Sequence, residues 1–241
     1  MFKQITLVFA LCAVTFSSCD TTQDLSGILG TVLGESALTN GEVISGLKQA
    51  LEIGIGKGSD LLSRQDGYYK SAYKILLPEE ARKVTDRLQN VPGFSALEEN
   101  VLEKINRGAE DAASKAKPIF VDAIKSMSIA DAMGILKGDK DAATRYLERT
   151  TFDALYNEFN PVIVASLDKF NARQYWADAV NTYNRIPLIG EPVDPDLDDY
   201  VTRRALNGLF AQVAKEELNI RNNIGARTTD LLRKVFAAQD N

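Results

Sequence analysis

Residues 200–218, YVTRRALNGLFAQVAKEEL, carry the most regular hydrophobic pattern in the chain. Apolar residues recur there every three or four positions, the spacing that aligns them along one side of an α-helix. Two adjacent rows make this side wide, and they consist of Val201, Ala205, Leu209, Val213, Leu206, Phe210 and Ala214. The stretch therefore predicts a long helix with a broad face packed against other helices.

Helical spacing and helix-start signals recur along the rest of the chain. Capping boxes, in which a hydroxyl residue precedes an acid by three positions, are predicted at Thr39, Ser95 and Ser128. The glycines of GIGKG (residues 54–58) predict the end of the first helix, and Pro161 predicts a bend or break in a later one. Because no long alternation of apolar and polar residues occurs, we expect an all-α fold. The expected architecture is an irregular bundle of roughly eight to ten helices, with one short extended arm or hairpin near residues 68–77 as the sole exception.

The N-terminus has the pattern of a secretory signal. Lys3 provides a positive charge, and residues 5–14, ITLVFALCAV, form an apolar run. This run is too short for a membrane-spanning helix, which needs roughly 20 residues. The small residues Ser17 and Ser18 then precede Cys19. This arrangement resembles a bacterial lipobox.

The match to a lipobox is good but incomplete, because Phe16 stands where leucine is usual. The alternative is an ordinary cleaved signal with an incidental cysteine. The chain contains 2 cysteines, and the other one, Cys12, lies in the segment that would be removed, so Cys19 has no disulfide partner. We therefore interpret residues 1–18 as a lipoprotein signal peptide and Cys19 as the lipidation site.

Acylation of Cys19 predicts where the protein resides. Several acyl chains, at about 0.8 kcal/mol per buried methylene, give stable anchoring without a spanning helix. We expect an exported protein that is lipid-anchored to the bacterial cell envelope, at the outer membrane facing the periplasm. Asp20 alone does not choose the membrane, because the sorting rule for that position differs between bacterial lineages.

The remaining chain predicts one domain. Residues 19–38 are rich in Gly, Ser and Thr and are expected to form a tether with a weakly amphipathic lead-in, followed by a single α-helical domain over residues 39–241. Apolar residues make up 45% and charged residues 25% of the chain, as in ordinary globular proteins. The formal net charge of −5 argues against nucleic acid as a partner and against electrostatic binding to anionic lipid.

The absence of histidine from the sequence narrows the chemistry. It excludes Ser-His-Asp and Cys-His catalysis as usually built, as well as His-ligated zinc. With Cys19 acylated, thiolate and iron–sulfur chemistry are excluded too. The side chains that could still act as catalysts are carboxylates, Lys, Tyr, Ser and Thr. An enzymatic function is therefore disfavoured but not excluded. We expect no cofactor and no metal.

A candidate polar centre lies near the C-terminus and comprises Glu216, Glu217, Arg221, Arg227 and Asp230. Glu217 and Arg221 are four residues apart and so face each other on a helix. One interpretation is a buried centre whose arginines bind an anionic or carboxylate ligand. The other, which we favour, is an ion-pair network that fastens the final helices together.

Two further groups allow both a site and a structural role. Oxygen ligands that suit calcium occur at Asp194, Asp196, Asp198 and Asp199, but their spacing is not that of an EF-hand, and an acidic helix start explains them equally well. A ligand groove could contain the aromatic residues Tyr146, Tyr156, Tyr175, Trp176 and Tyr183, which at helical spacing are more often core residues.

Several long phrases resemble one known family. They are NRGAEDAASKAKPIFVDAIKSMSIADAMGILKGDKDAATRYLERTT (residues 106–151), YNRIPL (183–188), DLDDYVTRRALNGLFAQVAKEELNIR (196–221) and ARTTDLLRKVF (226–236). Together they resemble a family of bacterial lipoproteins and exported proteins catalogued as a domain of unknown function, DUF4197. The resemblance covers roughly residues 25–237 and implies a helical envelope protein, but it implies no activity.

These observations lead to an expected function. We expect a lipid-anchored cell-envelope protein that is a non-enzymatic binding or scaffolding module. Its partners would be the membrane, through the N-terminal acyl chains, and an unidentified envelope protein or a hydrophobic small molecule. The alternative is a carboxylate-dependent envelope hydrolase. A weaker idea is membrane perturbation by the glycine-rich residues 25–58.

Overall fold

The computed structural model describes residues 38–169, 171–187 and 192–237. The chain divides into two units, Met1–Thr39 and Asn40–Asn241, and the second unit is the one described below. The expected signal peptide, Cys19 and the tether up to residue 37 lie outside the described residues.

Nine α-helices and one short 3₁₀ helix occur within the described residues, which contain no β-strand. The all-α prediction is therefore confirmed. The four longest helices are α2 (Asn40–Leu62), α4 (Leu97–Ala113), α7 (Ala142–Lys169) and α9 (Asp198–Asn222). The shorter elements are α3 (Glu79–Leu88), α5 (Ala116–Ser126), α6 (Ile129–Lys137), α8 (Ala172–Asn184), η1 (Ile224–Ala226) and α10 (Asp230–Ala237).

Helix α9, which contains residues 200–218, is the central element of the bundle. It packs against α2, α4 and α7. All of the residues predicted to form its broad apolar face are buried except Ala214, which is half-buried. The ring of Phe210 lies 5.8 Å from that of Phe120 on α5 and 6.5 Å from that of Phe152 on α7, so it links three helices.

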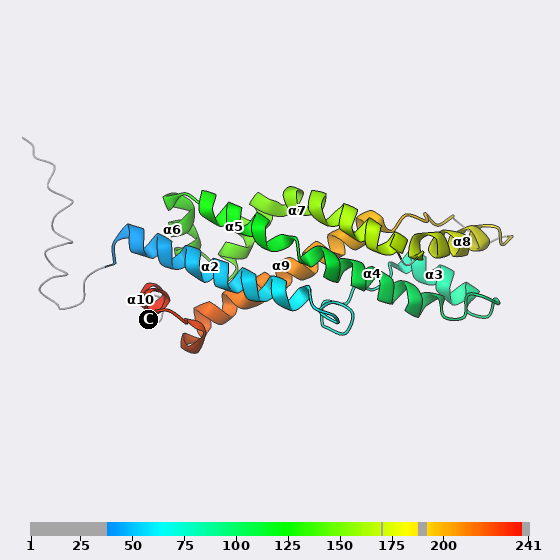
Figure 1. Cartoon of the computed structure of the whole chain (residues 1–241), viewed down its shortest axis with the longest axis horizontal. Helices are drawn as coiled ribbons and strands as arrows, with labels where there is room; N and C mark the ends of the chain where they lie inside the picture. Colours follow the sequence, from blue (N-terminus) through cyan, green and yellow to red (C-terminus); the bar gives the residue numbers. More distant parts are fainter. Residues whose placement is uncertain (1–37, 170, 188–191, 238–241) are drawn as a thin grey trace, which may run out of the picture. The chain divides into compact units, whose positions relative to one another are not determined.

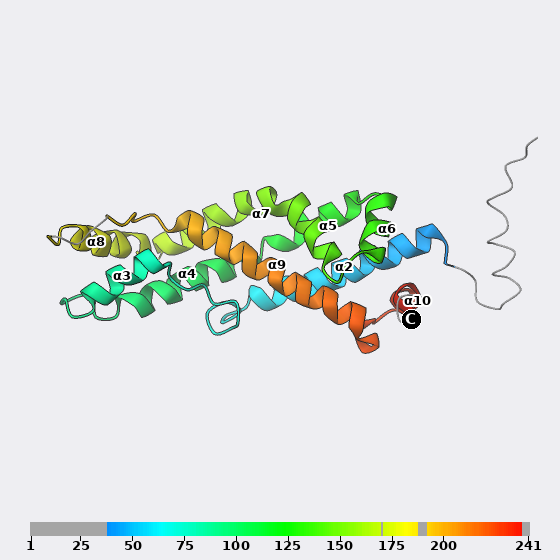
Figure 2. The same ribbon diagram turned by 180° about the vertical axis from the view of Figure 1, so that it is seen from behind.

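The shorter helices complete the two ends of the bundle. Helices α3 and α8 lie side by side at one end, whereas α6 and α10 lie at the other (Figures 1 and 2). Helix α10 packs on α2, and the side chain of Val235 lies close enough that a Cβ on Gly46 would come within 2.7 Å of it. In the described ranges, no helix is both long enough and apolar enough to cross a bilayer.

The first helix does not end at GIGKG, as the sequence predicts, but continues to Leu62. A glycine inside a helix costs roughly 0.5–1 kcal/mol relative to alanine. Here packing compensates, because a Cβ on Gly54 or Gly58 would lie 3.4 Å from a side-chain carbon of α9. Residues 40–58, part of the segment considered for membrane perturbation, thus belong to a helix whose apolar face is covered by the bundle.

The three predicted capping boxes have different outcomes. The box at Ser128 is present: its Oγ accepts the backbone N–H of Asp131 at 3.1 Å, and the Asp131 carboxylate accepts the backbone N–H of Ser128 at 3.1 Å. The prediction at Ser95 is wrong, because α4 begins at Leu97 without a side-chain cap. Helix α2 begins at Asn40, directly after Thr39.

The Ser95 prediction fails because the neighbouring residue determines the chain path. The ring of Phe94 stacks on Tyr175 of α8 at 5.8 Å, and the backbone N–H of Leu97 donates to the Phe94 carbonyl at 3.0 Å. The resulting turn delays the helix start to Leu97.

Pro161 lies inside α7, which runs through it without a break. Of the predicted bend or break at Pro161, the break is therefore wrong. Proline removes one backbone N–H and so leaves the carbonyl four residues earlier without its helical partner. Pro161 and Asn157, the residue that carries this carbonyl, are both exposed, so water can hydrate the free acceptor.

The segment between α2 and α3 contains no helix and no strand, only turns followed by irregular chain at residues 74–78. Side chains of α4 hold it in place. Asn106 accepts the backbone N–H of Ile75 at 2.8 Å and donates to its carbonyl at 2.9 Å. Glu110, which is buried, accepts the backbone N–H groups of Tyr68 and Tyr69, both at 3.0 Å. The sequence predicts an arm here but not the α4 side chains that fix it.

Candidate functional site

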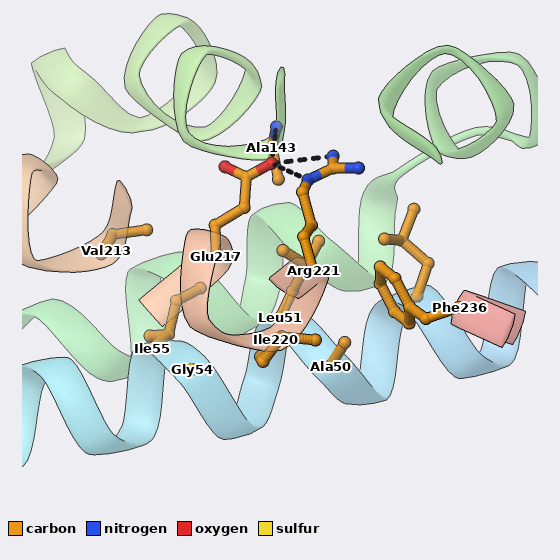
Figure 3. A pocket seen from close by; sticks show the side chains of 11 residues that line it. Ala50, Leu51, Gly54, Ile55, Ala143, Val213, Glu217, Ile220, Arg221 and Phe236 are labelled. Carbon is orange, nitrogen blue, oxygen red and sulfur yellow. Dashed lines mark hydrogen bonds and ion pairs between the residues drawn. The ribbon is translucent and has the colours of Figure 1, made fainter. Parts of the chain in front are cut away.

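The carboxylate of Glu217 projects from α9 onto the first turn of α7, where Figure 3 shows its bonds to Ala143 and Arg221. It accepts the backbone N–H groups of Ala143 and Thr144 at 3.0 and 2.9 Å, and the Thr144 hydroxyl at 2.8 Å. The first N–H groups of a helix have no partner inside the helix, and the helix dipole makes this end positive. Glu217 therefore acts as a distant N-terminal cap for α7.

Arg221 binds the same carboxylate from one turn further along α9. Its Nε and Nη2 donate to Glu217 Oε1 at 3.0 and 2.9 Å, and Nη2 also donates to the Ile135 carbonyl in α6 at 2.9 Å. The side chain of Arg221 is 10% exposed and that of Glu217 is 5% exposed. The pair thus connects α9 with both α6 and α7.

Arg227 follows η1 and is 2% exposed. Its Nε donates to the Ile220 carbonyl at 3.1 Å, and its Nη2 donates to the Arg221 carbonyl at 2.9 Å. These carbonyls lie near the negative end of α9, where a cation is stabilising. The guanidinium also lies 5.6 Å from the ring centre of Phe236 in α10. Arg227 therefore closes α9 and supports α10.

The other two residues of the predicted centre lie apart from these three. Glu216 accepts an N–H of Gln212 at 2.9 Å, and Gln212 in turn accepts the hydroxyl of Tyr73 at 2.6 Å. Asp230, whose side chain is 90% exposed, pairs with Arg233 at 2.7 Å. The five residues therefore do not converge on one centre.

A cavity of about 20 Å³ lies beside the Glu217–Arg221 pair, between α2, α9 and α10 (Figure 3). It is lined mainly by apolar side chains and has room for about one water molecule. Because the carboxylate and the guanidinium are engaged by backbone groups and by each other, their contacts match the ion-pair alternative: they fasten α9 to its neighbours.

A much larger hollow, of about 390 Å³, lies elsewhere in the bundle and is here called the cleft. Its walls come from α4, the junction of α7 and α8, and the segment that leads into α9. Its floor consists of buried apolar residues, namely Val101, Ile105, Leu167, Ala172, Trp176 and Leu197. The volume falls in the range of roughly 300–1,000 Å³ that is usual for small-molecule sites.

Charged residues form the rim of the cleft. Arg173 pairs with Asp168 and with Asp198, each at 3.2 Å, and Asp196 lies beside them in the lining. Burial raises the pKa of the Asp198 carboxyl, the negative charge of Asp196 raises it further, and Arg173 opposes both effects. In the floor, Trp176 is 2% exposed, and its indole N–H has no hydrogen-bond partner among the described residues.

The predicted acidic cluster leads into α9 through successive turns. Asp194 accepts the backbone N–H of Asp196 at 2.9 Å, and Asp196 accepts that of Asp198 at 2.8 Å. Asp199 accepts the hydroxyl of Tyr156 at 2.7 Å, and its carboxylate also pairs with Arg203 at 3.0 Å. No group of three or more His, Cys, Asp or Glu residues suited to a metal occurs within residues 38–169, 171–187 and 192–237.

The five aromatic residues considered for a groove do not gather in one place. Tyr146, Trp176 and Tyr183 are buried, and the hydroxyl of Tyr175 donates to the Gly93 carbonyl at 2.8 Å. Of the five, Trp176 lines the cleft. Sequence reasoning named this residue and two of the rim acids, but not Arg173 or the α4 residues of the floor, because nothing local links them.

These features define the class of protein: an all-α bundle whose helix ends are capped by buried polar side chains, with a cleft of small-molecule size between α4, α7, α8 and the segment before α9. The chain belongs to the family of proteins of unknown function DUF4197, whose profile matches residues 37–237. The predicted family is thereby confirmed. Neither a comparison with curated proteins nor one with solved structures gives a match.

Proposed function

We propose that this protein is a lipid-anchored cell-envelope protein that works by binding a ligand, and that the ligand occupies the cleft. The cleft carries this proposal, because it combines a volume of about 390 Å³ with a buried apolar floor and a charged rim. Such a combination is typical of small-molecule sites. The Glu217–Arg221 pair and Arg227 hold the helices together rather than contact the ligand.

Binding in the cleft is tested with N-phenyl-1-naphthylamine, a neutral apolar fluorophore. Trp176 is the single tryptophan of the chain and lines the cleft, so energy transfer from Trp176 to the bound fluorophore reports on this site. Ala177→Phe places a ring in the lining and should abolish the transfer. Ala154→Phe, on the exposed side of α7 outside the cleft, is the matched control and should not. Equal transfer in both variants, or none in the parent, contradicts the proposal.

The anchor is supported by the apolar run and small residues that precede Cys19. Metabolic labelling with palmitate should mark the parent and a Cys12→Ala variant, but not Cys19→Ala. After a high-salt wash, Cys19→Ala should leave the membrane fraction. Its retention there, together with an unlabelled parent, would remove the lipid anchor from the proposal.

The carboxylate-dependent hydrolase is the second candidate, and one observation favours it. Asp198 is a partly buried acid with a raised pKa in a cleft, the environment in which a carboxyl group can act as a general acid. Release of nitrophenol from nitrophenyl esters and glycosides should then be lost in Asp198→Asn. Release that is absent, or equal in the parent and the variant, rules this candidate out.

A further inference from the structure

The cleft has two chemically different parts, the floor and the rim, and the floor favours an apolar group. Val101 and Ile105 of α4 line the cleft together with Trp176 of α8, and all three are buried. Placing an alkyl or aromatic group there removes apolar surface from water on both partners, which is favourable by roughly 25 cal/mol per Å².

The rim has an excess of negative charge. Asp168, Asp196 and Asp198 line the cleft together with a single cation, Arg173. This guanidinium is shared, because it lies 3.2 Å from carboxylate oxygens of both Asp168 and Asp198. Three carboxylates therefore face one positive charge, and a second positive charge at the rim would be electrostatically favourable.

The electrostatics of Asp198 agree with this excess of negative charge. Burial and the negative charge of Asp196 raise the pKa of the Asp198 carboxyl, so its ionisation costs more than that of an exposed aspartate, and a further positive charge nearby would favour it.

We propose that the cleft binds an amphipathic organic cation, a small molecule with an ammonium group and an alkyl or aromatic part. The ammonium lies among the carboxylates of Asp168, Asp196 and Asp198, and the apolar part lies on the floor beside Trp176. This inference rests on the proposed binding function and specifies its ligand class.

Three probes of equal chain length test the charge preference on the full chain: n-octylammonium, n-octanol and octanoate. Quenching or shift of Trp176 fluorescence measures each affinity, since this residue is the only tryptophan. We expect octylammonium to bind about tenfold more tightly than octanol, the gain of one charge-assisted contact in a partly buried site. Octanoate should bind most weakly, and added salt should reduce the preference for the cation.

Two asparagine substitutions in one loop provide a matched pair. Asp194 and Asp196 each accept one backbone N–H through Oδ1, a role that asparagine retains, but only Asp196 lines the cleft. Asp196→Asn should weaken octylammonium binding threefold or more and leave octanol binding unchanged, whereas Asp194→Asn should change neither. Arg173→Gln should strengthen octylammonium binding, because it frees the carboxylates that this arginine occupies.

The outcomes separate the two proposals. If octanol binds as tightly as octylammonium and Asp196→Asn has no effect, the cation inference is overturned while the cleft still stands as a binding site. If none of the three probes and no N-phenyl-1-naphthylamine binds, the proposed function falls and the inference with it.

Discussion

Replacement of Glu217 by glutamine should destabilise the protein severely although it changes no side-chain volume. The carboxylate accepts three hydrogen bonds from the start of α7 and two from Arg221. An amide has one oxygen, so its NH₂ group must face either the Thr144 donors that bind Oε2 or the donors of Ala143 and Arg221 that bind Oε1. Each hydrogen bond to a charged group contributes about 1.5–3 kcal/mol.

The second part of the loss comes from Arg221, whose buried guanidinium would lose its ion pair with Glu217. Removing one partner of a buried pair costs about 3–5 kcal/mol. We therefore expect Glu217→Gln to lower the free energy of unfolding by about 3–5 kcal/mol, a large part of the roughly 5–15 kcal/mol typical of a domain. Urea unfolding followed by circular dichroism at 222 nm measures this as a lower midpoint with an unchanged slope.

The adjacent residue provides the control. Glu216 is half-buried and accepts a single hydrogen bond, from Gln212, so Glu216→Gln should cost no more than about 1 kcal/mol. The double variant Glu217→Gln with Arg221→Gln should cost at least about 1 kcal/mol less than the sum of the single variants, because both single changes remove the same ion pair. Equal midpoints for the Glu216 and Glu217 variants would refute the capping role.

Three further predictions concern packing and local electrostatics. Gly208→Ala should lower the free energy of unfolding by about 1–3 kcal/mol, because its Cβ would lie 2.8 Å from the ring of Tyr68. Gly134→Ala in α6, where a Cβ meets open space, should instead raise it by about 0.4–1 kcal/mol. Thermal unfolding measures both variants, and similar shifts would contradict the packing argument. Tyr68→Phe, which removes a buried 2.7 Å hydrogen bond to α9, should cost about 1 kcal/mol in urea, and an unchanged midpoint would count against that bond. The hydroxyl and backbone N–H of Ser128 lower the pKa of the Asp131 carboxyl. This carboxyl therefore stabilises the fold above its unfolded pKa, and the stabilisation is lost as pH falls through its folded pKa. Ser128→Ala should raise the Asp131 pKa in an NMR titration, and an unchanged pKa would show that the cap does not cause the shift.

The sequence predicted features whose partners lie within one helical turn. The box at Ser128 and the Glu217–Arg221 pair were found because spacings of three and four residues place side chains together on any helix. The broad face of α9 was found for the same reason. The sequence places Arg227 near Arg221 but does not predict what it binds. Its guanidinium donates to the carbonyls of Ile220 and Arg221, which lack helical partners only because α9 ends there.

Features that depend on distant partners were missed or misread. Gly54 and Gly58 indicate a helix end by local propensity, but α9, about 150 residues later, packs on them and keeps the helix intact. Nothing in the local sequence distinguishes Glu110 from other helical acids, yet its carboxylate accepts the backbone N–H of Tyr68, 42 residues earlier in the chain. The floor and rim of the cleft come from three parts of the chain, so no local pattern marks it.

The central position of α9 also affects when the core can form during synthesis of the chain. About 140 residues separate the end of α2 at Leu62 from the start of α9 at Asp198, and at roughly 5–20 residues per second a ribosome needs about 7–28 s to make them. Until then α2 has α4, α5 and α6 as partners but neither α9 nor α10. A nascent chain of this protein therefore leaves part of the apolar face of α2 uncovered, and it completes its core only when its last quarter has been synthesised.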